Sequence, residues 1–161
     1  MATITAALNV SSDISSYGGP TISNTMTMTK AGTKNGLERT SSVQRVYLTS
    51  TDQVDLLSGA LTGSTVADMT LSSAAKVYIK YLEADTSKYL TVGFGTAGAG
   101  TPSPSYAKSD AAECFELGRL YGDEWMIIPW SGVSADGDIV VYPNVATAAD
   151  EAIVEYIVFF D

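Results

Sequence analysis

The stretch Ala152-Ile153-Val154-Glu155-Tyr156-Ile157-Val158-Phe159-Phe160 carries the strongest structural pattern of the chain. Successive side chains of a β-strand point to opposite faces, so both faces of this stretch are mostly apolar. A strand of this kind is typical of the middle of a sheet that is covered on both sides. We therefore expect a central strand over most of this stretch. Its two faces are Val154, Tyr156, Val158 and Phe160 on one side and Ile153, Glu155, Ile157 and Phe159 on the other.

Further alternating runs lie upstream of this stretch, and none has a sustained helical period. Turn-rich segments separate them, which favours an all-β fold, an antiparallel β-sandwich or jelly roll. The chain has 161 residues and a mass of 16.9 kDa, so we expect residues 31–161 to form a single domain. A short helical turn is also expected over 52–59, after a cap at Ser50 or Thr51. The predicted strands cover residues 43–49, 64–71, 76–83, 88–94, 112–120, 124–130 and 138–142.

Residues 1–30 have a different character, which predicts an extended N-terminal arm. Alternation is present in 1–10 and again in 21–30, where Ser and Thr occupy one whole face. Such a ribbon has little apolar area to bury, so it is either an exposed edge strand or an arm that pairs with another chain. We expect the arm to contact a partner through its larger apolar side chains, Ile4, Leu8, Ile22, Met26 and Met28.

Composition excludes most familiar catalytic chemistry. The chain has no histidine and one cysteine, while 36 residues are Ser or Thr. It therefore lacks the commonest general base and cannot form an internal disulfide or a cysteine zinc site. We expect a protein that is not an enzyme, with no cofactor and no bound metal.

Charge and hydropathy restrict the partners and the compartment. The formal net charge is −9, with +1 on residues 1–80 and −10 on residues 81–161. A phosphate backbone would be repelled, so nucleic acid is not an expected partner. Neither a secretory signal nor a stretch of about 20 apolar residues is present, so we expect synthesis in the cytoplasm and no membrane anchor.

Two motifs suggest chemistry, and the first is rejected. Residues 93–98 read GFGTAG, a literal GxGxxG, but Pro102 and Pro104 follow where a dinucleotide site needs a helix. The pair Asp136 and Asp138 resembles a fragment of a calcium loop without the spacing of an EF-hand. The same pair is left open as a glycosidase carboxylate pair, because the sequence does not give the distance between the two groups.

Three side chains are candidate surface contacts: Lys34, Arg39 and Trp130. Lys34 and Arg39 belong to the basic segment 31–42, which is either a solvated connection or a contact with an acidic neighbouring subunit. We expect Trp130 to be exposed at a strand end and Trp125 to be in the core. A carbohydrate-stacking platform made from these indoles, Tyr106 and Tyr121 is the alternative.

Residues 76–161 resemble β-sandwich virion proteins of tailed bacteriophages, of the capsid decoration or cement type. The resemblance implies a non-enzymatic virion protein, a dimer or trimer that bridges and stabilises neighbouring subunits of the major capsid protein. A tail, baseplate or fibre component and a carbohydrate-binding module remain alternatives. The resemblance rests on Val77-Tyr78-Ile79-Lys80, Ala84-Asp85-Thr86-Ser87, Leu90-Thr91-Val92-Gly93-Phe94, residues 120–124, Ile127-Ile128-Pro129-Trp130 and Ala152-Ile153-Val154-Glu155-Tyr156.

Overall fold

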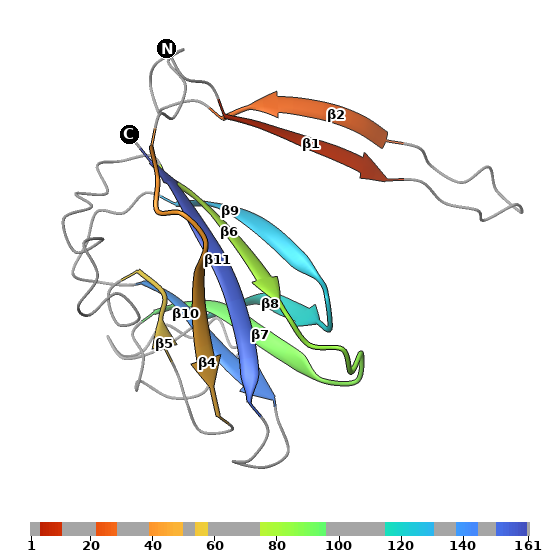
Figure 1. The fold of residues 1–161 in the computed structure, drawn as a ribbon, viewed down its shortest axis with the longest axis vertical. Helices are drawn as coiled ribbons and strands as arrows, with labels where there is room; N and C mark the ends of the chain where they lie inside the picture. The colour runs from red at the N-terminus through yellow and green to blue at the C-terminus, as the bar shows by residue number, and fades with distance from the viewer. Residues whose placement is uncertain are drawn as a thin grey trace, which may run out of the picture.

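The computed structural model describes residues 4–10, 22–28, 39–49, 54–57, 75–95, 115–130, 138–144 and 151–160. These residues form antiparallel strands in three sheets, and none of them is helical (Figure 1). The predicted all-β sandwich is thereby confirmed. The strands are β1 (Thr5–Val10), β2 (Ile22–Thr27), β3 (Arg39–Thr40), β4 (Gln44–Leu48), β5 (Val54–Asp55), β6 (Ala75–Tyr81), β7 (Tyr89–Gly95), β8 (Phe115–Tyr121), β9 (Trp125–Trp130), β10 (Asp138–Asn144) and β11 (Ala152–Phe160).

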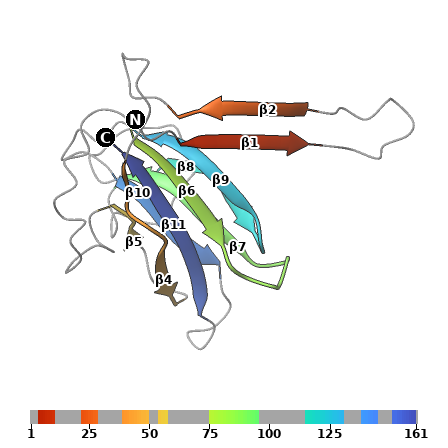
Figure 2. The ribbon, with the colours of Figure 1, turned by 45° about the horizontal axis from the view of Figure 1, so that its top comes forward.

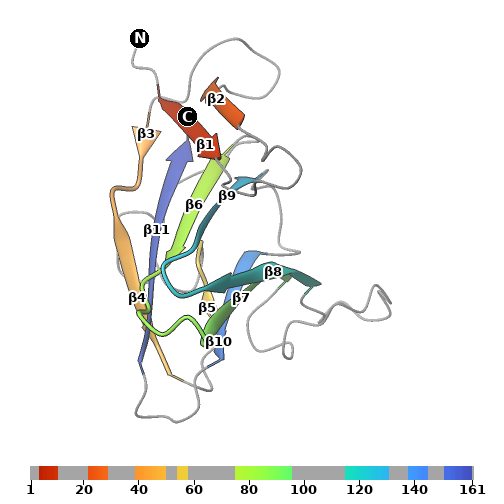
Figure 3. The same cartoon turned by 90° about the vertical axis from the view of Figure 1, so that its right-hand side faces the viewer.

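The body of the protein has the strand order of a jelly roll. β7 pairs with β8, β6 with β9, β5 with β10 and β4 with β11, as in one long antiparallel ribbon. Rolling this ribbon up adds the pairs β10–β7 and β11–β6. The result is two facing sheets, β5-β10-β7-β8 and β4-β11-β6-β9, with β3 continuing the edge beside β11 (Figure 3). An eight-stranded double sheet of this order is a jelly roll.

β11 is central, as its sequence predicts. It pairs with β3 and β4 along one edge and with β6 along the other. Its Val154, Tyr156 and Val158 are fully buried between the two sheets. The opposite face is only half-buried, so the expectation of cover on both faces holds for one face alone. Each fully buried side chain of this size contributes about 1.5–3 kcal/mol through the hydrophobic effect.

One local prediction is wrong. Val54 and Asp55 form β5 against β10 instead of a helical turn, with Val54 opposite Val141. The next residue, Leu56, is fully buried and its N–H donates to the carbonyl of Ile139 at 2.8 Å. Burial of apolar side chains against β10 outweighs the weak local preference for a single helical turn. The strand predicted over 64–71 lies outside the described residues.

Candidate functional site

The N-terminal arm is a two-stranded hairpin. β1 and β2 are antiparallel over six residues each, with Ala7 opposite Thr25. The segments predicted to pair with a neighbouring chain therefore pair first with each other. Their sequences, TAALNV and ISNTMT, contain no charged residue. A two-stranded hairpin is at best marginally stable in water, so this element needs a further contact.

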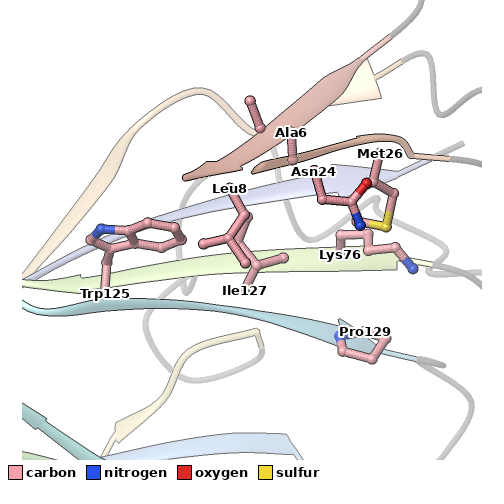
Figure 4. A pocket seen from close by; sticks show the side chains of 9 residues that line it. Ala6, Leu8, Asn24, Met26, Lys76, Trp125, Ile127 and Pro129 are labelled. Carbon is pink, nitrogen blue, oxygen red and sulfur yellow. The ribbon is translucent and has the colours of Figure 1, made fainter. Parts of the chain in front are cut away.

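The hairpin turns its apolar face towards its own body. Figure 2 shows it lying over the sheet that contains β6 and β9, and Figure 4 shows Leu8 beside Trp125 and above Ile127. An open groove of about 450 Å³ separates the two surfaces. Among the described residues that line it, only Lys76 is charged. The lining consists of Ala6, Ala7, Leu8, Asn24, Met26, Lys76, Trp125, Ile127 and Pro129.

The predicted contact residues of the arm divide into two groups. Leu8 and Met26 are each 45% exposed at the groove. Met28 is only 2% exposed, and its N–H donates to the carbonyl of the half-buried Ile4 at 2.9 Å. The Met28 side chain is thus covered within the chain, while the expected partner contacts of the arm stay predictions. The Ile22 side chain is outside the described part of the protein.

The structure does not test the two basic residues that were expected as surface contacts. Lys34 lies outside the described residues, and Arg39 forms part of β3 with a side chain that is not described. The carboxylate pair is likewise not tested. Asp136 lies outside the described residues, and Asp138 begins β10 with a side chain that is not described. The described residues therefore test neither the basic contact nor the carboxylate pair.

The two tryptophans exchange the environments expected of them. Trp130 is half-buried and stacks on Phe94, with ring centroids 5.3 Å apart and an interplanar angle of 21°. Trp125 is 48% exposed, with its ring centroid 6.0 Å from that of Tyr78. The reason is register: β9 is paired so that Ile128, opposite Val77, faces the core, and Trp130 shares its face. The expectation of an exposed Trp130 and a core Trp125 is wrong.

Within the described residues, no strand pairs with either outer edge of the hairpin. Residues that face each other across an antiparallel pair alternate between hydrogen-bonded and non-hydrogen-bonded pairs. Because Met28 and Ile4 are hydrogen-bonded, the pair Thr25 and Ala7 is not. Outward N–H and C=O groups therefore belong to Ser23, Thr25 and Thr27 on β2 and to Thr5, Ala7 and Asn9 on β1.

The edges of the jelly roll are protected in the ways that limit strand addition. Ser42, with φ 63°, interrupts the edge between β3 and β4, and Pro129 stands in the edge strand β9. β5 has two residues, and the pairing of β7 with β8 is irregular between Val92 and Gly93. Within the described ranges, the hairpin thus offers the strand edges without proline, charge or irregular pairing.

Several titratable side chains of the body form surface ion pairs, and one, Tyr81, is buried in the core. Arg45 donates to Glu155 at 3.0 Å and Lys80 lies 3.4 Å from Asp123, both at the surface. Burial, followed by the charges of Glu83 and Asp85, raises the pKa of Tyr81 to about 12. In the described part of the chain, no three His, Cys, Asp or Glu side chains are grouped to hold a metal ion.

No family model, curated protein or solved structure matches this chain. None of the described residues belongs to a helix long and apolar enough to cross a membrane.

The pairing of the two N-terminal strands is the feature that the sequence interpretation missed. Both runs alternate over similar lengths, and Gly18-Gly19-Pro20 stands between them. A turn signal between two alternating runs is the usual mark of a hairpin. The hydroxyl-rich face drew the interpretation towards an intermolecular strand instead.

Proposed function

We propose that this chain is a non-enzymatic virion structural protein, a capsid decoration or cement subunit that bridges neighbouring subunits of the major capsid protein. The observation that carries the proposal is the uncharged hairpin, whose outer edges are open while the edges of the body are protected. Double-sheet jelly rolls occur in viral capsid proteins, although they also occur in lectins and enzymes.

The hairpin fits a bridging role for physical reasons. An exposed strand edge binds an extended segment of a partner through main-chain hydrogen bonds, and pockets beside it select the side chains. The groove beneath Leu8 and Met26 supplies such a pocket. Many equivalent copies on one shell make modest individual affinities sufficient for stable attachment.

Co-sedimentation with capsids tests this proposal. Full-length protein is mixed with shells of the encoding phage that lack it, and the bound fraction is measured. Ala7→Lys places a charge beside the outer edge of β1 and should weaken attachment at least about 10-fold. Thr86→Lys, in an exposed turn of the body, makes the same charge change elsewhere and should leave attachment unaltered.

Two results would contradict the proposal. One is wild-type protein that remains in the supernatant at saturating shell concentration. The other is a particle image in which labelled protein decorates the tail, which would favour the tail, baseplate or fibre alternative.

A carbohydrate-binding module is the second candidate, because Trp125 is 48% exposed at the groove that Asn24 and Lys76 also line. An exposed indole beside amide and amino groups suits a sugar ring. A glycan array tests this function. Binding that is lost in Trp125→Ala and kept in Trp130→Phe would favour the sugar-binding function over the virion proposal.

A further inference from the structure

We propose that the free edge of β2 pairs with the same edge of a second copy of this chain. The two hairpins then form one continuous four-stranded antiparallel sheet across a two-fold axis. The resemblance to virion proteins implies a dimer or trimer without specifying the interface; this inference names the interface, and it is tested without any shell.

The first argument is position. β2 is the strand of the hairpin farther from the jelly-roll body in two different views, so its outer edge faces away from the body (Figures 1 and 2). Ser23, Thr25 and Thr27 direct their N–H and C=O groups to that side. Among the described residues no strand pairs with this edge.

The second argument is self-complementarity. A two-fold axis at Thr25 places Thr25 opposite the second copy's Thr25, and Ser23 opposite the second copy's Thr27. Three outward N–H groups from each copy then meet three carbonyls of the other copy. The side chains of these pairs are all hydroxylated and share one face, and cross-strand Thr–Thr and Thr–Ser pairs are favourable. The Ser23 hydroxyl already donates to Asn9 at 2.8 Å and keeps its acceptor capacity for the second copy's Thr27.

The third argument is that charge does not oppose a second copy at this edge. Two chains with a net charge of −9 each repel one another over most approaches. β1 and β2 contain no charged residue, so this contact adds no like-charge pair between the strands. Joining the hairpins also removes the instability of an isolated two-stranded ribbon.

β2 is better suited to this contact than β1. Strand propensity favours the outward residues of β2, of which Thr25 and Thr27 are β-branched, over those of β1, of which Thr5 alone is. β1 also lies on the side of the hairpin nearer the body, where a second hairpin would meet β9 (Figure 2).

A matched pair of proline variants tests the inference. Thr25→Pro removes an outward N–H from β2, and Ala7→Pro removes one from β1. The two residues face each other in a non-hydrogen-bonded pair, so neither change removes a hydrogen bond within the hairpin. Sedimentation velocity of full-length protein over a wide concentration range measures self-association.

We expect concentration-dependent dimers for wild type and Ala7→Pro, and an affinity at least about 10-fold weaker for Thr25→Pro. A wild type that stays monomeric overturns the inference. So does self-association that only Ala7→Pro weakens, or that neither variant changes. None of these results bears on co-sedimentation with shells, so the capsid proposal is judged separately.

A cysteine variant covers the case in which proline unfolds the hairpin. Residues opposite each other in a hydrogen-bonded antiparallel pair have Cα atoms about 5.5 Å apart, within reach of a disulfide. In a Cys114→Ser background, Thr25→Cys should give a covalent dimer under mild oxidation, and Ala7→Cys should not. Crosslinking of Ala7→Cys alone, or equal crosslinking of both variants, overturns the inference.

Discussion

Ser41 and Val158 are joined by two hydrogen bonds of different kinds. The Ser41 N–H donates to the Val158 carbonyl at 2.9 Å, and the Val158 N–H donates to the Ser41 hydroxyl at 2.9 Å. A side-chain oxygen thus takes the place of a backbone carbonyl where Ser42 adopts φ 63°. The break between β3 and β4 keeps β11 paired while it makes this edge unsuitable for another strand.

Replacing Ser41 with alanine should destabilise the protein by about 1–3 kcal/mol, because the N–H of the buried Val158 loses its acceptor. Urea unfolding measures the change. Ser87→Ala is the control, since it removes a 2.6 Å hydroxyl hydrogen bond to Asp85 in an exposed turn. Equal losses in both variants would show that burial of the Val158 N–H is unimportant.

Gly122 should not tolerate a side chain. A Cβ at this position would lie 2.5 Å from the Glu83 carbonyl oxygen and 3.0 Å from that of Asp85, and both atoms belong to the backbone. We expect Gly122→Ala to lower stability by about 1–3 kcal/mol, the usual cost of overpacking.

Gly118→Ala is the control for this steric effect, because its Cβ would meet the flexible Met126 side chain at 3.9 Å. Thermal unfolding compares the two variants. A Gly122→Ala protein as stable as Gly118→Ala would mean that the turn between β8 and β9, which contains Gly122, lies farther from the connection between β6 and β7 than described.

Tyr81 should make stability depend on alkaline pH. Burial, and then the charges of Glu83 and Asp85, raise its pKa to about 12, against 10.0 for an ordinary tyrosine. The folded state therefore binds the phenolic proton more tightly than the unfolded state does. Its contribution to stability is complete below pH 10 and is lost as the pH rises towards 12.

Tyr81→Phe tests this dependence and removes a buried hydroxyl that has no hydrogen-bond partner in the described part of the chain. We expect unchanged or higher stability at neutral pH and a smaller loss between pH 10 and 12. Chemical unfolding at a series of pH values gives both quantities. Parallel pH profiles for the two proteins would count against the predicted role of Tyr81.

Leu8 should shield Trp125 from solvent, since the two side chains lie beside each other at the groove (Figure 4). In a Trp130→Phe background, Leu8→Ala should shift the emission of Trp125 to longer wavelength and increase its quenching by iodide. Thr5→Ala, on the opposite face of the hairpin, is the control. Identical spectra for Leu8→Ala and its parent would place the hairpin away from β9.

The accuracy of the sequence interpretation follows the strength of local patterning. β11 and β6 were predictable because Val154, Tyr156, Val77 and Ile79 repeat with the period of a strand buried on one face. Val54 was assigned wrongly because its strand depends on a pairing with Val141, 87 residues further along the chain. Short strands held by such distant partners carry almost no local signal.

The hairpin site shows the same division. Alternation placed Leu8 and Met26 each on the more apolar face of its own segment, and the structure places both at the groove. It did not reveal that Met28 is buried or that Trp125 is the exposed indole. These outcomes depend on register, since a shift by one residue exchanges the faces of a strand.

By itself, the amino-acid sequence determined that this protein is built of strands, that β11 is central and that histidine-based chemistry is absent. Period-two alternation and composition are local properties, so no fold is needed to recognise them. Only the tertiary structure decided the jelly-roll strand order, the pairing of β1 with β2 and the set of open edges. Those features arise from hydrogen bonds and burial between segments far apart in the chain, whose free energies no single segment contains.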